Sequence, residues 1–369
     1  GFDKDFLGLL TAIPAFVGLV FAFPSGALSD RFGRRSAMIW GTLLSSLALV
    51  GVILLTNKVG LCAAAALSGC GRTLVMVSSA PFLAENSTAE DRTSLFSTHF
   101  GLRTLAGFVG NLVGGFLPTL FAHLLAAEAE SVTSYQGVLW TVFALNLAAL
   151  IPLSRMREAE RKKPASPEPG PNPSTGIPFG LVGKLLLPNA IISIGAGLLI
   201  PYLNVFFKEK FAIPDAALGT VFSISSIMTG VATLSAPLLA RRMGHVRAIV
   251  FSQLASIPFL LALGFSPWLG VAVTAFWVRA ALMNMGNPLY SAFAMEQVDE
   301  ASRARVSSLL GMGWNIGWSV GPYLSGLMQM RVGFGPIFLV TTAAYVIGAA
   351  TVHLLFARTD ARPGIREPE

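Results

Sequence analysis

Two long apolar segments near the start of the chain are joined by the stretch Gly26-Ala27-Leu28-Ser29-Asp30-Arg31-Phe32-Gly33-Arg34-Arg35. Three of these ten residues are arginines. Lys and Arg in a short loop next to membrane spans resist translocation, so a loop of this kind stays on the cytoplasmic side. The stretch therefore predicts two membrane helices joined on that side, and it fixes the predicted orientation of every later segment.

Composition indicates a membrane protein along the whole chain. Of the 369 residues, 53% are hydrophobic and 12% are charged, and the mean hydropathy is +0.66. These values lie outside the range of soluble domains. Apolar runs of about 20 residues cross a bilayer as helices, whereas β-barrel strands are shorter and alternate strictly. We therefore predict an all-α polytopic membrane protein with spans at 6–27, 37–56, 59–83, 95–122, 133–153, 182–206, 217–239, 247–266, 268–293, 306–329 and 334–357.

The excess of basic over acidic residues is explained by this topology. The net charge is +7, and most of the 26 Lys and Arg fall at predicted cytoplasmic span ends and loops. This distribution is typical of membrane topology and does not indicate a nucleic-acid partner. The two cysteines, Cys62 and Cys70, fall in one predicted span, so no disulfide framework is expected.

The sequence repeats itself at an offset of 211 residues. Gly33 aligns with Gly244, and charged landmarks keep the same register. The aligned pairs are Asp30-Arg31-Phe32-Gly33 with Arg241-Arg242-Met243-Gly244, Glu85 with Glu296, Arg92 with Arg303, Gly110 with Gly321, and Gly115 with Gly326. Both copies place the Arg loop on the same side, which predicts parallel repeats related by an axis along the membrane normal.

The repeat also predicts the domain organisation. Residues 1–153 form an N-terminal transmembrane half, 154–181 a basic and Pro-rich cytoplasmic linker, 182–357 a C-terminal transmembrane half, and 358–369 a cytoplasmic tail. The counterpart of the span at 182–206 would precede Gly1. We therefore expect the natural protein to have a first span ahead of this sequence, so that 11 of 12 spans are present; a protein of eleven spans is the alternative.

The pattern Gly-x-Leu-x-Asp-Arg-x-Gly-Arg-Arg resembles the signature loop that follows the second span in transporters of the major facilitator superfamily. With the two parallel halves and the basic linker, the resemblance covers essentially the whole chain. It implies two six-helix halves that transport a solute by alternating access. It also implies a monomer in the cytoplasmic (inner) membrane, with a small-molecule solute, the lipid bilayer and a coupling ion such as a proton as partners, no nucleic acid and no cofactor.

The resemblance further implies that the loop is a conformational latch, which holds the cytoplasmic side closed while the cavity faces outward. Asp30 is the acid of this latch, and Arg34, Arg35 or Arg92 can pair with it. The expected latch residues are Gly26, Asp30, Arg31, Gly33, Arg34, Arg35 and Arg92, with the glycines allowing close approach and a sharp reversal. Glu85 and Glu296 are expected to join Arg92 and Arg303 in surface networks. The alternative is a loop that only sets topology.

Three arginines fall inside predicted spans. A guanidinium in mid-span costs about 2.5–3.5 kcal/mol on insertion scales, so such residues usually face a cavity or a partner. We expect Arg72 and Arg279 to face a central cavity from opposite halves and to favour an anionic group on the solute. Arg103 shares a helix face with His99 and is a third candidate. The alternative is structural: the guanidinium groups reach the interface, bind carbonyls, or pair with an acid on the preceding span.

Polar and aromatic residues in the last third of the chain are further candidates for solute binding: Asn284, Asn287, Trp314, Asn315 and Trp318. Packing with interhelical hydrogen bonds is the alternative interpretation of this group. Gly107, Gly110 and Gly114 share one helix face, which favours close helix packing. In related drug–proton exchangers a Gly-rich stretch with a proline lies at this place, whereas this chain has Asn111.

Three function classes follow. The first is a secondary transporter of a small organic solute of anionic or amphipathic character. The second is a multidrug drug–proton antiporter, whose coupling acid would lie on the preceding span. The third is a non-transporting receptor on the same fold. An enzyme is not expected, because no metal-ligand cluster or nucleophile–base arrangement stands out in the sequence.

Overall fold

The structure is a computed structural model of the 369-residue chain, and it describes residues 3–88, 91–128, 131–156, 179–298 and 300–357. Side chains are not described at 92–94, 96–97, 100, 179, 300–301 and 303–305 within those ranges. Most of the predicted linker, the whole predicted tail, and the side chains of Arg92 and Arg303 therefore lie outside the described residues.

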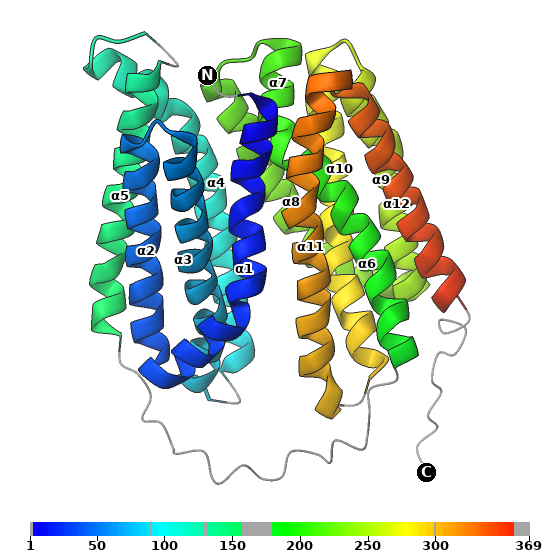
Figure 1. Ribbon diagram of the computed structural model, residues 1–369. Helices are drawn as coiled ribbons and strands as arrows, with labels where there is room; N and C mark the ends of the chain where they lie inside the picture. The colour runs from blue at the N-terminus through cyan, green and yellow to red at the C-terminus, as the bar shows by residue number, and fades with distance from the viewer. Residues whose placement is uncertain (1–2, 89–90, 129–130, 157–178, 299, 358–369) are drawn as a thin grey trace, which may run out of the picture. The chain divides into compact units, whose positions relative to one another are not determined.

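The first five helices form the main part of one compact unit, unit 1 (Figure 1). They are α1 (Lys4–Phe32), α2 (Arg34–Leu54), α3 (Lys58–Glu85), α4 (Arg92–Leu124) and α5 (Val132–Arg155). α3 packs along α1 and α2, and α5 packs on α2 and α4. Two shorter stretches, Asn204–Ser223 and Pro322–Leu327, belong to the same unit.

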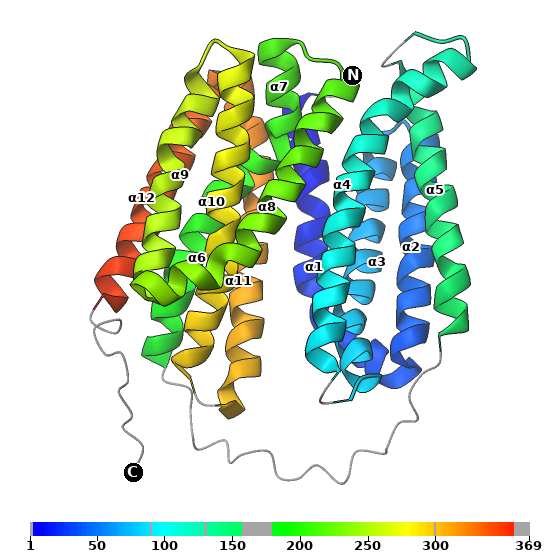
Figure 2. The same ribbon diagram turned by 180° about the vertical axis from the view of Figure 1, so that it is seen from behind.

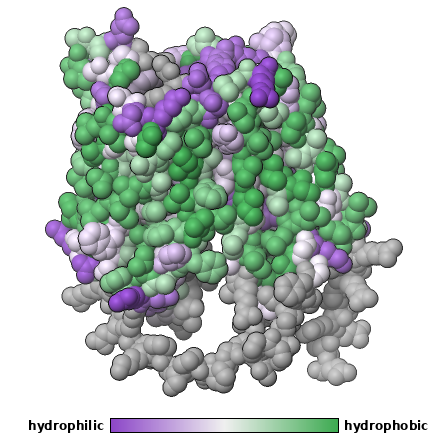
Figure 3. Space-filling model, viewed as in Figure 1, coloured by the Kyte–Doolittle hydropathy of each residue, from purple (hydrophilic) through white to green (hydrophobic). Residues whose placement is uncertain are grey.

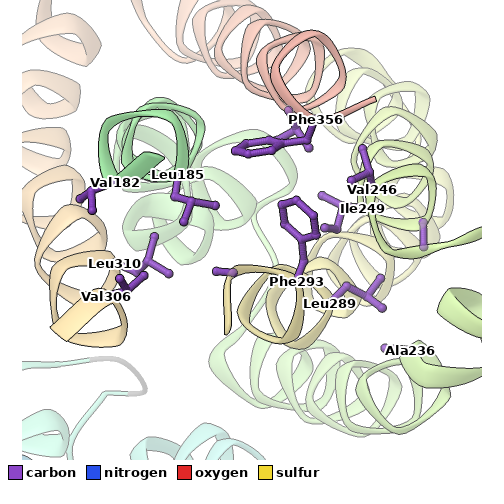
Figure 4. Close-up of a cluster of buried hydrophobic side chains, with 13 residues drawn as sticks. Val182, Leu185, Ala236, Val246, Ile249, Leu289, Phe293, Val306, Leu310 and Phe356 are labelled. Atoms are coloured by element: carbon purple, nitrogen blue, oxygen red, sulfur yellow. The ribbon is translucent and has the colours of Figure 1, made fainter. Parts of the chain in front are cut away.

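The later helices make up unit 2, which is seen from both sides in Figures 1 and 2. They are α6 (Phe179–Leu199), η1 (Ile200–Tyr202), the part of α8 (Asp215–Met243) after Ser223, α9 (His245–Phe265), α10 (Leu269–Glu296), α11 (Glu300–Val332) apart from Pro322–Leu327, and α12 (Gly335–Phe356). The short helix α7 (Leu203–Phe211) belongs to unit 1 from Asn204 onward. α12 packs on α6 and α9, and α9 packs on α10. Buried side chains from six helices of this unit, including Leu185, Leu289 and Phe356, form an apolar cluster (Figure 4).

The predicted all-α membrane architecture is confirmed. Ten helical segments of the described chain are long and apolar enough to cross a membrane. Large apolar side chains stand exposed on them, among them Phe23 at 77% and Leu354 at 81%. On the face seen in Figure 3, hydrophobic side chains cover the helices and hydrophilic ones gather at the helix ends. Exposed apolar surface of this extent is typical of a protein that faces lipid.

Two of the eleven predicted spans differ from the expectation in detail. The span predicted at 306–329 is the 33-residue helix α11, but its polar and glycine residues keep it below the hydropathy of the other ten. The span predicted at 182–206 is not one regular helix, because it tightens into η1 at Ile200–Tyr202. Pro201 explains this change, since proline has no N–H to donate and its ring crowds the preceding turn of an α-helix.

The repeat predicted from the sequence has a counterpart in the backbone. Gly33 separates α1 from α2 with φ +96°, and Gly244 separates α8 from α9 with φ +84°. Residues with a Cβ rarely adopt these angles, so both reversals depend on glycine. Two equivalent positions thus make the same turn with the same residue type.

Candidate functional site

The centre of the signature loop is an ion-paired group at the ends of three helices. Arg34, the first residue of α2, places Nη1 2.6 Å from Oδ1 of Asp30 and Nε 3.2 Å from Oε1 of Glu85. Asp30 lies in the last turn of α1, and Glu85 is the last residue of α3. The predicted pairing of Asp30 with Arg34 is confirmed. A cation at a helix N-terminus is unfavourable by itself, so the two carboxylates compensate both the charge and the helix dipole.

Two buried serines extend this group into the bundle. Arg34 Nη1 donates a hydrogen bond of 3.1 Å to Oγ of Ser29, which shares a 2.7 Å hydrogen bond with Oγ of Ser78. Both serine side chains are fully buried. Sequence reasoning missed this extension, because the rotation of α3 that turns Ser78 toward α1 is not readable from the loop motif.

Arg35 has a different role from the one expected. Its Nε donates to the carbonyl oxygen of Leu153 at 3.2 Å, and its Nη2 donates to the carbonyl of Ser154. These are among the last carbonyls of α5, which have no partner within the helix and attract cations. Arg35 therefore binds the C-terminal end of α5, whereas Arg34 forms the ion pair with Asp30.

The remaining latch residues are placed as follows. Gly33 makes the reversal described above, whereas a Cβ at Gly26 would meet nothing within 4 Å, so the expected close approach there is wrong within the described residues. Arg31 is exposed, with Cζ 5.5 Å from the ring centroid of Phe32. The side chain of Arg92 lies outside the described residues.

The same end of the second repeat has a different pair. Nδ1 of His245 lies 3.3 Å from Oε2 of Glu296. At the offset of 211 these residues correspond to Arg34 and Glu85. The expected networks of Glu85 with Arg92 and of Glu296 with Arg303 fall partly outside the described side chains, and the partners that the structure gives the two glutamates are Arg34 and His245.

Arg279 is buried in unit 2. Its side chain is 2% exposed, and Nη2 donates a 2.7 Å hydrogen bond to the hydroxyl of Tyr345 on α12. The guanidinium carbon lies 5.7 Å from the centroid of the same ring. Nε is buried without a hydrogen-bond partner among the described residues. The role of Arg279 in solute binding stays a prediction.

The other two membrane arginines are exposed. Arg72 lies on α3 and shares an exposed face with Met76 and Ala80, spaced four residues apart. Arg103 lies on α4 on the same exposed face as His99. The roles of Arg72 and Arg103 in solute binding stay predictions.

The five polar and aromatic candidates separate into two places. On α10, Nδ2 of Asn287 donates to Oδ1 of Asn284 at 3.5 Å, and Asn284 donates to the carbonyl of Ala280 at 2.8 Å. On α11, Trp314, Asn315 and Trp318 lie together, and the indole N–H of Trp318 is buried without a partner among the described residues. Their roles in solute binding stay predictions.

A second charged group, at the other end of unit 1, was not predicted. Nζ of Lys208 lies 2.5 Å from Oδ1 of Asp215 and donates to the hydroxyl of Tyr135 at 3.0 Å. Tyr135 in turn donates to Oδ2 of Asp215 at 2.6 Å, and Lys4 pairs with Glu209 at 2.7 Å. Residues 204–223 lie in unit 1 with α1 and α5. No local motif marks this group, because its members come from segments that are distant in the sequence.

Comparisons with known proteins agree with this architecture. The family model of the Major Facilitator Superfamily matches residues 1–191 and again residues 185–369. The chain is 24% identical over 338 residues to "Uncharacterized MFS-type transporter YhjO" of Bacillus subtilis, covering 89% of this chain and 79% of that protein. It is also 24% identical over 401 residues to "Probable anion transporter 3, chloroplastic" of Arabidopsis thaliana, covering 97% of this chain and 73% of that protein.

Solved structures show the same fold. A D-xylose-proton symporter superimposes with a TM-score of 0.77 at 16% identity, covering 95% of this chain and 87% of the other. The two successive matches of the family model follow the two repeats seen in the sequence, and the fold is that of transporters. This chain belongs to the Major Facilitator Superfamily.

Proposed function

We propose that this protein is a secondary transporter that carries a small organic solute of anionic or amphipathic character by alternating access. The observation that supports the anionic character best is the buried guanidinium of Arg279. An arginine side chain remains protonated in proteins, so this site carries a full positive charge inside unit 2. A charge in such a place requires a compensating partner.

The described part of unit 2 offers no carboxylate near Arg279. Its acidic residues are Glu296 and Glu300, at the end of α10 and the start of α11. Glu296 lies 17 residues beyond Arg279 on the same helix, which corresponds to about 25 Å. Tyr345 provides a hydroxyl and a ring, both of which are neutral. A carboxylate or phosphate group on the solute would supply the missing negative charge through charge-assisted hydrogen bonds.

We further propose that Arg72, Arg103, Asn284, Asn287, Trp314, Asn315 and Trp318 take part in solute recognition. The buried indole N–H of Trp318 supports this role, since it is a donor that still requires an acceptor. The Arabidopsis relative is named as a probable anion transporter, which agrees with an anionic solute.

The signature loop is proposed as the latch of the transport cycle. Asp30, Arg34 and Glu85 join three helix ends through exposed or half-exposed ion pairs. Such pairs are worth on the order of 0–1 kcal/mol each, so they can break and re-form during a cycle. We place this loop on the cytoplasmic side of the inner membrane because of its arginines. We expect the protein to work as a monomer in which transport of the solute is coupled to an ion such as a proton.

A thermal-unfolding screen of the natural gene product tests the proposal. Organic anions and lipophilic cations are added separately, because a ligand that binds the folded state raises the unfolding temperature. We expect stabilisation by a subset of anions that disappears in Arg279→Gln. The exposed Arg331, at the end of α11, gives the matched control Arg331→Gln, which should respond like the wild type.

A second variant covers the case in which Arg279→Gln does not fold. Tyr345→Phe keeps the guanidinium and the ring but removes the hydroxyl acceptor, so the response to anions should persist or increase. Stabilisation by lipophilic cations alone would overturn the anionic proposal and favour a drug–proton antiporter.

A further inference from the structure

The turn between α8 and α9 in unit 2 is rich in arginine. Arg241 and Arg242 lie in the last turn of α8, and Arg247 lies in the first turn of α9. All three side chains are exposed. In unit 1, Asp30 stands at the position of Arg241 and pairs with an arginine of its own loop. The turn of unit 2 has no acid at that position.

The helices on either side of this turn supply no counter-charge. No Asp or Glu occurs between Asp215 and Glu296, a stretch that includes nearly all of α8, α9 and α10. Glu296, at the end of α10, lies 3.3 Å from Nδ1 of His245. Among the described side chains, Arg242 has no carboxylate partner. Exposed positive charge therefore remains at the end of α8.

Arg242 and Arg247 each continue an exposed apolar stripe. On α8, Leu234 and Leu238 precede Arg242 at intervals of four residues and are 74% and 62% exposed. On α9, Phe251 follows Arg247 by four residues and is 51% exposed. Residues four apart lie on one face of a helix. Each helix thus has one outward face with apolar side chains and an arginine at its end, and we name these five residues the α8–α9 face.

The opposite sides of both helices are packed in the protein. Ala236 of α8 and Ile249 of α9 are fully buried in the apolar cluster of unit 2 (Figure 4). Each lies two residues from a member of the α8–α9 face, Leu238 or Phe251, which puts it on the other side of its helix. The α8–α9 face therefore points away from this core. In a membrane protein, an exposed apolar surface of this kind contacts lipid.

We propose that the α8–α9 face binds an anionic phospholipid of the cytoplasmic leaflet. The arginines place the turn on the cytoplasmic side, by the rule used for the signature loop, and the leaflet on that side carries anionic lipids. Arg242 and Arg247 bind the headgroup phosphate, because guanidinium groups bind phosphate through paired, charge-assisted hydrogen bonds. The acyl chains lie along Leu234, Leu238 and Phe251. This inference does not depend on which solute is transported.

Thermal unfolding with added lipids tests the inference. The natural gene product is depleted of lipid in detergent and titrated with phosphatidylglycerol or phosphatidylcholine of identical acyl chains, since a ligand of the folded state raises the unfolding temperature. Both lipids contain a phosphate, but only phosphatidylglycerol has a net negative charge. We expect phosphatidylglycerol to stabilise the protein at a concentration roughly tenfold or more below that of phosphatidylcholine.

Removal of the two arginines should abolish this preference. In Arg242→Gln/Arg247→Gln, the concentration of phosphatidylglycerol required should rise roughly tenfold or more, to that of phosphatidylcholine. The matched control Lys58→Gln/Arg331→Gln removes two exposed charges, at the start of α3 and the end of α11, and should respond like the wild type. If the double variant does not fold, each single arginine variant should show a loss of about fivefold.

Three results would overturn the proposal. Equal responses of the wild type to both lipids would leave the arginines with a role in topology alone. Equal losses in the arginine variant and its control would indicate an effect of net charge and not a site. Glycerol 3-phosphate contains the headgroup phosphate without acyl chains. If it stabilised the wild type over the same concentrations, and this effect disappeared in Arg242→Gln/Arg247→Gln, the arginines would bind a soluble anion and not a lipid.

Discussion

The signature-loop end of unit 1 and the equivalent end of unit 2 share a backbone turn but differ in what stabilises them. In unit 1, Arg34 joins Asp30 and Glu85 and reaches the buried pair Ser29 and Ser78. In unit 2, the position of Arg34 is His245, that of Asp30 is Arg241, and Ser29 and Ser78 are replaced by Ala240 and Leu289. A polar network in one repeat thus corresponds to apolar residues in the other.

The apolar residues of unit 2 are part of a larger core. Leu289 is 3% exposed and belongs to the cluster with Phe293, Val246, Ile249 and Phe356, whose two phenylalanine rings meet edge to face at 5.0 Å (Figure 4). Close apolar packing resists rearrangement, whereas exposed ion pairs re-form easily. We infer that the end of unit 1 is suited to switching and that the end of unit 2 is a rigid support. Four substitutions test this difference, in order of decreasing effect on stability.

Leu289→Ala should have the largest effect. The substitution leaves a cavity in the buried cluster, and such changes typically destabilise a protein by about 2–4 kcal/mol. The matched variant Ser78→Ala, at the equivalent position of unit 1, removes one hydrogen bond and should cost about 1 kcal/mol. Chemical or thermal unfolding of the purified protein measures both. Equal losses for the two variants would contradict a rigid apolar support in unit 2.

Arg34→Ala should follow, with a loss of about 1–2 kcal/mol. The guanidinium side chain is 15% exposed, and its removal takes from Asp30 and Glu85 the cation that pairs with both of them among the described side chains. Because Asp30 and Glu85 are 65% and 42% exposed, solvent screens part of their repulsion. His245→Ala is the control in unit 2 and should change stability much less. A larger loss for His245→Ala than for Arg34→Ala would reverse the comparison.

The features of this comparison that depend on local sequence patterns could be predicted from the sequence. Span lengths, the repeat and the turn at Gly33 follow from apolar runs, charge and glycine, which act over a few residues. Contacts between helices could not be predicted from the sequence, because the partners are far apart in it. Tyr345 lies 66 residues beyond its partner Arg279, and Ser78 lies 49 residues beyond Ser29. Both contacts depend on how each helix is rotated, and packing of the whole bundle sets that rotation.

Asp30→Asn should change stability little but slow transport. Asparagine keeps the size of the side chain and loses its charge, so the pair with Arg34 weakens while Glu85 still binds that arginine. If the latch is part of the cycle, turnover in proteoliposomes should fall several-fold at unchanged expression and orientation. Arg241→Gln, at the equivalent position of unit 2, is the control and should leave turnover unchanged. Normal turnover in Asp30→Asn would leave the loop with a role in topology alone.

His245→Arg should have the smallest effect and sharpens the comparison most directly, because it places the arginine of unit 1 at the same turn of unit 2. An arginine is charged at every physiological pH, whereas an imidazole is charged only when protonated. The new guanidinium would face Glu296 but not a second carboxylate, since Arg241 stands where unit 1 has Asp30. We therefore expect a change in stability below about 0.5 kcal/mol and no loss of turnover. Thermal unfolding and proteoliposome transport measure the two quantities. If this substitution alone slowed transport as much as Asp30→Asn, a permanent ion pair in unit 2 would impede the transport cycle. Switching would then involve the equivalent ends of both units and not the unit 1 network alone.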